Sequence, residues 1–560
     1  GWDGWSPTLS LSDFRLLDQN GNVALTLPRV ETSVSWQSVV IGEIRLRRLE
    51  VNGPQLLVRR DVQGHVHVAG MDMERPVEQE DSAVINWFIK QRQVVIRDGT
   101  VVWQDELRNA APLRLDQVHL LLENSGRRHR FGLTAVPPPA LAAPLDVRGE
   151  LSMPTFNDLH NAQGRVYARL DYADVAAWKM WLPLPFALKS GRGALRGWTE
   201  FAEGELRDVT IDLELDDFRA TLKPDLPELD LAHLAGRLAW RQQAERADAS
   251  TRGLELTTRN GTKLTPGDIT VRHVAQQGDK PANGEIRSSQ LQLEPIIALA
   301  QYLPINEKLR VQLGRFAPVG VLDSGSFSWS GDLDAPAAYA LRAQFRGLGI
   351  SAVDAFPGLT RLTGSIEANT HSGTLVFSAN GTRLMLPGVF PAPVDFDSVA
   401  AQASWKITDQ VAVKISRLTF ANADTAGSVQ GDYKTLANAP GWMDLSGTIA
   451  RAKVSAIHQY LPLTVSPPVR IWLRDALLAG EASDAHFVVR GNLADFPFAN
   501  NKAGLFQVTA KATDAALVYA SRWPTIENIK ADVLFEGSRI EVNAVEATSV
   551  GIRLNKVRVE

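Results

Sequence analysis

The sequence predicts a mostly β protein: an elongated, curved, largely antiparallel β-sheet gutter with a few short amphipathic helices. Three observations lead to this prediction. Apolar and polar residues alternate with a period of two, a recurring irregular spacing indicates β-bulges, and the turn sequences connect strand to strand.

The alternation is clearest over residues 209–215, Val-Thr-Ile-Asp-Leu-Glu-Leu. Successive side chains of a strand point to opposite faces of a sheet, so the four apolar residues share one face and Thr210, Asp212 and Glu214 share the other. One face of the predicted sheet is therefore apolar and the other is charged.

A second pattern has two alternating apolar residues, a gap of two residues, and then two more. The gap moves the second pair to the opposite face unless a β-bulge absorbs one residue, and repeated bulges would curl the sheet into a gutter. A turn between two short strands, or ordinary sandwich strands, would give the same spacing. The pattern occurs in five places: Leu9, Leu11, Phe14 and Leu16; Ile44, Leu46, Leu49 and Val51; Leu113, Leu115, Val118 and Leu120; Val413, Ile415, Leu418 and Phe420; and Ile552, Leu554, Val557 and Val559.

Glycine-containing turns predict hairpins between these strands. Residues 18–21 and 61–64 both read Asp-x-x-Gly, and Asn-Gly at 260–261 and at 380–381 is a stronger hairpin signal. Strand is therefore expected to follow strand directly.

Internal repetition predicts modules added along one axis. Helical patterns ending in Leu-Pro occupy residues 174–183, 293–304 and 454–462, and each precedes a glycine-rich strand segment, at 191–197, 325–331 and 480–491. A further segment, 464–473, is a possible helix. The expected organisation is an N-terminal β region over 1–150 and groove modules over 151–285, 286–440 and 441–560, the last one truncated.

Composition limits the classes of function. Charges nearly balance, with 59 Lys plus Arg against 63 Asp plus Glu, so no broad basic field is available for nucleic acid. The chain has no cysteine, which excludes thiolate catalysis and Cys-ligated metal. It has no apolar run long enough to span a membrane and no signal peptide, so we expect a soluble piece of something longer.

No catalytic or metal constellation is convincing, and neither an enzyme nor a cofactor is predicted. His65 and His67 would share a strand face, but two ligands do not complete a metal site, and surface histidines are the better interpretation. Acidic residues 212, 214, 216 and 217 are interpreted as a solvated strand face. The scattered tryptophans are interpreted as core anchors or groove lining rather than as a platform for sugars.

The apolar face poses the main question, because too few helices are predicted to cover so wide a sheet. Either the sheet closes on itself or something other than protein fills it, and lipid acyl chains are the natural filling. The groove-lining candidates are Leu113, Leu115, Val118, Leu120, Val209, Ile211, Leu213, Leu215, Val413, Ile415, Leu418 and Phe420.

The chain resembles the AsmA-like family of bridge-like lipid-transfer proteins. The resemblance is carried by residues 2–18, 34–46, 53–61 and 87–98, and the order of the modules extends it over essentially the whole chain. It implies a periplasmic protein that moves phospholipid between inner and outer membranes through a hydrophobic groove. It also implies an N-terminal transmembrane anchor and a C-terminal part outside this chain. It brings no catalytic motif.

Two other classes of function stay open at this stage. A scaffold or chaperone could pair an exposed sheet edge with client outer-membrane protein strands. An enzyme acting on an envelope polymer would need a pair of acids in one cleft. Protein partners, lipid species and transport direction are not predicted.

Overall fold

The computed structural model describes residues 2–3, 6–17, 23–34, 45–69, 71–72, 91–152, 162–181, 184, 186–354, 356–463, 465–499 and 503–560. The turn predicted at 18–21 and the residues Trp36, Ile44 and Trp87 lie outside this part of the chain.

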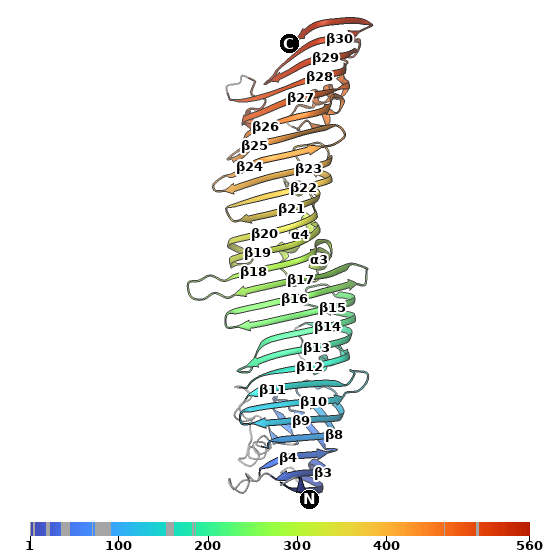
Figure 1. The fold of residues 1–560 in the computed structure, drawn as a ribbon, viewed down its shortest axis with the longest axis vertical. Helices are drawn as coiled ribbons and strands as arrows, with labels where there is room; N and C mark the ends of the chain where they lie inside the picture. The colour runs from blue at the N-terminus through green and yellow to red at the C-terminus, as the bar shows by residue number, and fades with distance from the viewer. Residues whose placement is uncertain are drawn as a thin grey trace. The chain divides into compact units, whose positions relative to one another are not determined.

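Contacts divide the chain into two compact units. Unit 1 contains Gly1–Gln277 and Gln301–Pro304, and unit 2 contains Gly278–Ala300 and Ile305–Glu560. In both units, long strands connected by short turns pair with their neighbours in sequence order (Figure 1). The prediction of a mostly β, largely antiparallel fold is confirmed.

The strands of unit 1 are β1 (Trp2–Asp3), β2 (Ser6–Leu17), β3 (Val23–Val34), β4 (Leu46–Asn52), β5 (Gln55–Arg60), β6 (Val66–Val68), β7 (Met71–Asp72), β8 (Gln93–Asp105), β9 (Leu113–Ser125), β10 (Arg128–Val136), β11 (Leu145–Ser152), β12 (Gln163–Asp174), β13 (Ala187–Ala202), β14 (Glu205–Thr221), β15 (Leu229–Gln243), β16 (Arg246–Thr258) and β17 (Lys263–Val274). From β8 to β17 each strand pairs antiparallel with the next. β4 and β5 pair in parallel with β8, a local exception to the antiparallel order.

The strands of unit 2 are β18 (Asn283–Gln292), β19 (Val319–Asp332), β20 (Ala335–Ile350), β21 (Gly358–Asn369), β22 (Ser372–Met385), β23 (Val394–Ile407), β24 (Val411–Ala421), β25 (Thr425–Leu436), β26 (Ala439–Lys453), β27 (Leu477–Asn492), β28 (Gly504–Leu517), β29 (Ile526–Glu536), β30 (Arg539–Ser549) and β31 (Ile552–Val559). Every one of them pairs antiparallel with the next.

The described residues of each of the five spaced patterns lie within a single strand, namely β2, β4, β9, β24 or β31, so a turn among these residues is excluded; Ile44 of the second pattern is outside the described part. The gap is a bend. In β9 the register with both neighbours shifts at this point and Gln117 has φ +48°. In β24 the register shifts with both β23 and β25. Asp217 of β14 has φ +52° at the equivalent place. Asp tolerates this left-handed conformation better than most residues do.

The hairpin predicted at Asn380-Gly381 is wrong, whereas the one at Asn260-Gly261 is confirmed between β16 and β17. Gly381 has φ +65° inside β22, where the register with β21 shifts between Leu359 and Leu362. Asn-Gly supplies a positive φ, and a bulge needs that conformation as much as a tight turn does. Sequence alone does not separate the two uses.

Short helical segments interrupt the strand order where the Leu-Pro patterns predict them. Residues 293–304 contain α3 (Leu293–Ala300), but residues 174–183 and 454–462 form the 3₁₀ segments η2 (Ala177–Met180) and η3 (Val454–Tyr460). The possible helix at 464–473 is α5 (Pro467–Ala476). The sequence analysis missed α4 (Glu307–Phe316) and the short η4 (Leu493–Asp495).

The core lies on the inner side of the bends. In unit 2, Phe345, Leu362 and Ala379 form a buried cluster. Leu348 and Leu359 pack against it from one side of the bend, and Ile366, Leu375 and Phe377 pack from the other. Apolar residues of both arms therefore meet at the bend, which places the apolar face on its concave side.

Small residues occupy the bend in the last strands of unit 2. Register partners form a continuous alanine row: Ala452, Ala482, Ala512, Ala531 and Ala544. Ala531 is 4% exposed. Side chains this small let neighbouring strands bend sharply without an internal clash.

Enlarging the alanine row should therefore destabilise unit 2. Ala531→Leu is expected to lower the free energy of unfolding by about 1–3 kcal/mol, because a well-packed site must shift to accept the added methylenes. Ala510→Leu, at a half-buried position on the preceding strand, is the matched control and should change it by less than ~0.5 kcal/mol. Urea denaturation of both variants measures the difference. Equal stability of the two variants would contradict tight packing at the bend.

Candidate functional site

Apolar residues on successive strands form rows that run across the strands, perpendicular to the strand direction. Residues paired in register on adjacent antiparallel strands share a face, so each row marks a line along one face of the sheet. The first row of unit 1 runs from β8 to β17 and contains Ile96, Leu120, Leu133, Val147, Ala168, Gly197, Ile211, Leu238, Thr251 and Ile269. It carries no charged residue.

Unit 2 contains two longer apolar rows. One runs from β18 to β28: Ile286, Phe327, Leu341, Ala368, Gly373, Trp405, Val413, Tyr433, Met443, Gly491 and Gly504. The other runs from β20 to β30: Phe345, Gly364, Phe377, Ala401, Leu418, Val429, Gly447, Phe487, Val508, Phe535 and Ile540. Neither row carries a charged residue over its whole length.

At several positions in these rows a large ring is the register partner of a glycine. A Cβ added at Gly447 would clash with the Phe487 ring, and one added at Gly373 would clash with the Trp405 ring. Each ring therefore lies over the backbone of the neighbouring glycine. This arrangement keeps aromatic side chains flat against the sheet, so they contribute apolar area without rising as barriers.

Apolar side chains away from the bends are only partly covered. In unit 1, Leu238 and Trp240 are 37% and 38% exposed, although they belong to the apolar face. Helical segments cover the sheet on the other side of the bend instead: Val175 and Ala176, just before η2, pack on Leu188, Phe218 and Ala220. In unit 2, α3 contacts β19, and η3 and α5 contact β27.

The twelve groove-lining candidates occupy three strands, β9 and β14 in unit 1 and β24 in unit 2. Leu113, Val118 and Leu215 are buried, and the other nine are half-buried. Ile211 and Leu120 belong to the first row of unit 1, and Val413 and Leu418 belong to the two rows of unit 2. Their contact with lipid stays a prediction.

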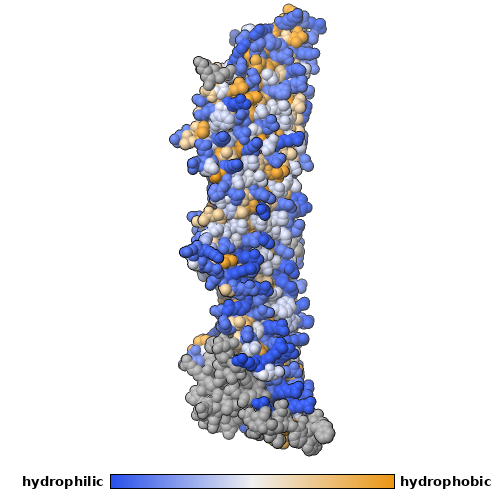
Figure 2. Space-filling model, turned by 60° about the vertical axis from the view of Figure 1, so that its left-hand side comes forward, coloured by the Kyte–Doolittle hydropathy of each residue, from blue (hydrophilic) through white to orange (hydrophobic). Residues whose placement is uncertain are grey.

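The opposite face carries rows of charges. One row of unit 1 reads Glu150, Arg165, Glu200, Asp208, Arg241, Asp248 and Arg272 across β11–β17. Figure 2 shows one view of the molecule in which hydrophilic residues dominate and hydrophobic ones gather toward the C-terminal strands. Charges confined to one face fix the register, because a slip by one residue would bury them.

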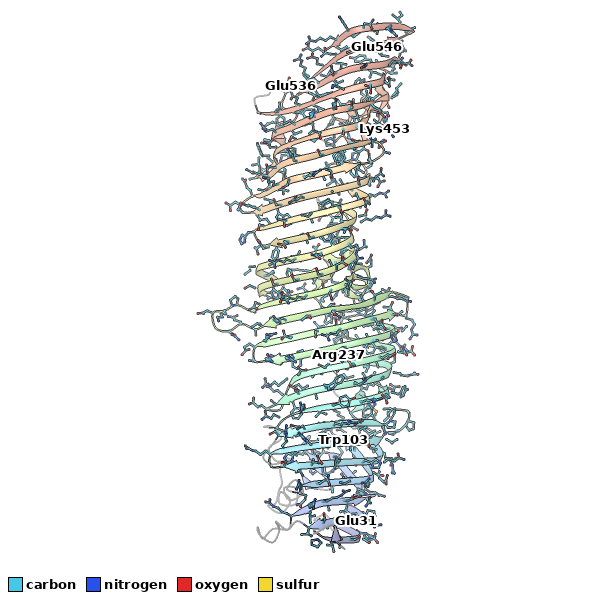
Figure 3. All side chains as sticks on the ribbon, viewed as in Figure 1. Glu31, Trp103, Arg237, Lys453, Glu536 and Glu546 are labelled. Carbon is cyan, nitrogen blue, oxygen red and sulfur yellow. The ribbon has the colours of Figure 1, made fainter. Side chains whose placement is uncertain are left out.

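Three of the four acids at residues 212, 214, 216 and 217 contact separate partners. Arg237, labelled in Figure 3, donates two hydrogen bonds to Asp212, at 2.5 and 2.8 Å, and holds the pKa of Asp212 below its usual value. His233 Nδ1 lies 2.8 Å from Asp216, and Arg259 donates to Asp217. These are structural cross-strand ion pairs.

A hollow near these charges also lies on the polar face. It has a volume of ≈ 620 Å³ and is lined by Tyr167, Trp198 and pairs such as Asp208 and Arg241. The Arg237 guanidinium lies 5.6 Å from the Trp198 ring centroid, so a cation covers this ring. It is separate from the apolar rows, which lie on the other face.

The two histidines considered for metal both contact Asp61. His67 Nε2 lies 2.9 Å from Asp61 Oδ2, and the backbone N–H groups of Gln63 and His65 donate to Asp61 Oδ1 at 2.9 Å. The carboxylate thus closes the predicted Asp-x-x-Gly turn between β5 and β6. Across the part of the chain that the structure describes, no group of three or more His, Asp or Glu is placed to hold a metal ion.

The comparisons with known proteins agree on one family. The family model described as YhdP protein matches residues 1–560. The chain belongs to the YhdP family. A relative from Escherichia coli (strain K12), described as an intermembrane phospholipid transporter YhdP, is 23% identical over 578 residues that cover 98% of this chain. The alignment spans 43% of that relative, so this chain corresponds to less than half of its length.

No solved structure matches this YhdP-family chain. None of the described helices has both the length and the apolar character needed to cross a membrane.

The sequence analysis missed most of the apolar rows of this YhdP-family chain. Tyr433 and Phe487 were not among the candidates, Trp405 was interpreted only as one of the scattered tryptophans that anchor the core or line the groove, and the paired glycines were seen only as turn or bend residues. Glycine recurs opposite aromatic residues in consecutive strands, and this recurrence could have indicated the rows.

Asp61 provides a test of the turn that contains both histidines. His67 is the largest cause that lowers the pKa of Asp61, to about 2, so the carboxylate stabilises the fold above pH ~4 and loses this effect as pH falls toward 2. His67→Ala should raise the pKa of Asp61 toward ~3.9. ¹³C NMR titration of the carboxyl group measures it. An unchanged midpoint would show that the backbone donors alone set the pKa.

Proposed function

We propose that this chain is a segment of a conduit that carries phospholipid acyl chains along the apolar face of its sheet. The observation that supports it most strongly is the set of uncharged rows that run across β8–β17 in unit 1 and β18–β30 in unit 2 while staying partly uncovered. The similarity to a relative described as an intermembrane phospholipid transporter supports the same proposal.

The energetics explain why such a face is useful. At about 0.8 kcal/mol per CH₂, exposing two acyl chains of about fifteen CH₂ groups each costs on the order of 24 kcal/mol. A barrier of this size permits roughly one escape from a bilayer per day. A continuous apolar face removes most of that cost while the headgroup stays in water.

The rows suit movement as well as binding. Apolar contacts are non-directional, so one position on a row binds an acyl chain about as well as the next. Rings laid flat over glycines leave no deep pocket that would trap a chain. We therefore expect many weak, similar sites along each unit, and no catalytic step.

In the full-length protein, this segment would act in the cell envelope, in the periplasm between the inner and outer membranes, and would support outer-membrane lipid homeostasis and the permeability barrier. An N-terminal inner-membrane anchor outside this chain belongs to the same proposal. Strands β9–β16 and β19–β30 are paired on both edges, which leaves few backbone groups for client strands and does not favour the scaffold alternative.

Ile211→Asp tests the conduit. An unpaired carboxylate in the lipid path should lower lipid transfer by more than about tenfold, because its desolvation costs well above the ~1.4 kcal/mol that a factor of ten requires. Thr210→Asp, one residue away on the polar face, is the matched control and should transfer lipid normally. Transfer of a fluorescent phospholipid between donor and acceptor vesicles is the measurement, with circular dichroism to verify both folds. Normal transfer by Ile211→Asp would refute the assignment.

A further inference from the structure

The connection between β27 and β28 folds back onto the apolar face of unit 2. Its first residues form η4, which contacts β26, and the described segment continues to Ala499. Phe498 is 2% exposed and is among the largest fully buried side chains of the described residues. Ala494, Asp495 and Ala499 are exposed. The segment therefore turns an aromatic ring toward the sheet and a charged residue toward solvent.

The Phe498 ring covers the end of one apolar row, the row that runs from β18 to β28. A Cβ added at Gly491 would lie 2.8 Å from this ring, and one added at Gly504 would lie 2.6 Å from it. These two glycines are register partners and the last members of the row. Farther back in the row, Trp405 and Tyr433 are only half-buried. The ring thus occupies the surface on which an acyl chain on this row would lie.

Phe496 packs on the end of a neighbouring row. This middle row lies between the two rows of unit 2 described above, carries no charged residue, and runs from Gly325 in β19 through Val489 to Phe506 in β28. The Phe496 ring centroid lies 5.0 Å from that of Phe506 and 6.0 Å from that of Phe498. The two rings of the segment therefore form one apolar layer over the ends of two rows.

The sheet itself narrows at this place. Glu536, labelled in Figure 3, is the last residue of β29 and pairs with Gln507 of β28. The next residue, Gly537, is in the β29–β30 turn, and its backbone N–H donates to the Phe506 carbonyl at 2.9 Å. Gly504 and Phe506 lie beyond the end of β29, so the β18–β28 row and the middle row both end at β28.

The remaining row continues past this point. Phe487 of β27 pairs with Val508 of β28, and Phe535 of β29 and Ile540 of β30 follow. The first three side chains are half-buried, and Ile540 is 37% exposed. Of these three rows, the β20–β30 row is therefore the one that stays partly uncovered and also extends onto the next strands.

We infer that Phe496 and Phe498 direct acyl chains from the two rows that end at β28 onto the β20–β30 row. This inference rests on the proposed function. A chain that reaches either ring would have to displace a packed side chain to advance, and no strand continues its row beyond β28 in the part of unit 2 that the structure describes. A step of two residues toward the bend, about 7 Å, brings a chain from the middle row to the open row. Both phenylalanines are thus positioning residues, which set the rows that a lipid uses.

A photoreactive phosphatidylcholine with a diazirine at the end of each acyl chain tests the inference on the whole chain. After irradiation, residue-level mass spectrometry should find adducts on Val508 at least about fivefold above those on Phe506 and on residues 491–499. The double variant Phe496→Ser with Phe498→Ser uncovers the two row ends. It should reduce this ratio by about fivefold or more, because adducts then spread onto the uncovered positions.

Phe356→Ser is the matched control, because the Phe356 ring is 64% exposed and belongs to none of the rows. This variant should leave the ratio unchanged, and circular dichroism verifies the fold of each variant. Transfer of a fluorescent phospholipid between vesicles should not rise in the double variant, since the uncovered rows still end at β28. The labelling of the unaltered protein decides the inference without any variant.

The outcomes separate the two proposals. Equal labelling of Val508 and of residues 491–499 in the unaltered protein would overturn this inference and leave the conduit standing. Faster transfer by the double variant would do the same, because it would show that the two covered rows lead onward. Adducts on Trp405 and Leu418 without adducts on Val508 would also overturn the inference. Absence of adducts from all the rows would overturn the conduit as well.

Discussion

The structure depends on one constraint: an apolar face that stays free of charge from strand to strand while the protein leaves it partly uncovered. Exposure of such a face to water is unfavourable. The charged face must therefore fix the register between neighbouring strands. Cross-strand pairs such as Asp212 with Arg237 do this, since a slip by one residue would bury their charges. Each exposed ion pair contributes little to the free energy of folding. Its main effect is to exclude strand pairings that are shifted by one residue.

Bends follow from the same constraint. A flat sheet with one apolar face would expose the whole of it, whereas a bend in each strand brings apolar residues of both arms together, as Phe345, Leu362 and Ala379 show. Only the residues nearest the bend become buried. Those farther along each strand stay half-exposed, and the short helices cover the other arm. The fold therefore has a packed core and an open apolar surface on one face, and the position of the bend sets the proportion between them.

Much of this organisation could be predicted from the sequence. Alternation in residues 209–215 gave the two faces, and the spacing in residues 113–120 and 413–420 gave the bends, because both are local consequences of strand geometry. The rows could not be predicted, since they depend on which residues pair across strands. The Asn-Gly at 380–381 failed as a turn because a bulge requires the same positive φ. α4 was missed because a ten-residue helix with exposed Leu309 and Val311 lacks a buried stripe.

The two faces also divide the kinds of interaction between them. Directional contacts are concentrated on the polar face, where they fix the strands, and the apolar face offers dispersion and hydrophobic contacts that are nearly alike from row position to row position. If polar anchors stood among the rows, a bound chain would gain a preferred position and would have to leave it at a free-energy cost with every step. Thr251, a polar member of the first row, uses its hydroxyl to accept the backbone N–H of Ile269, which occupies that group within the sheet. Thr251 therefore satisfies its hydroxyl within the sheet at the position where the row is interrupted, as the proposed passage of acyl chains along this row would require.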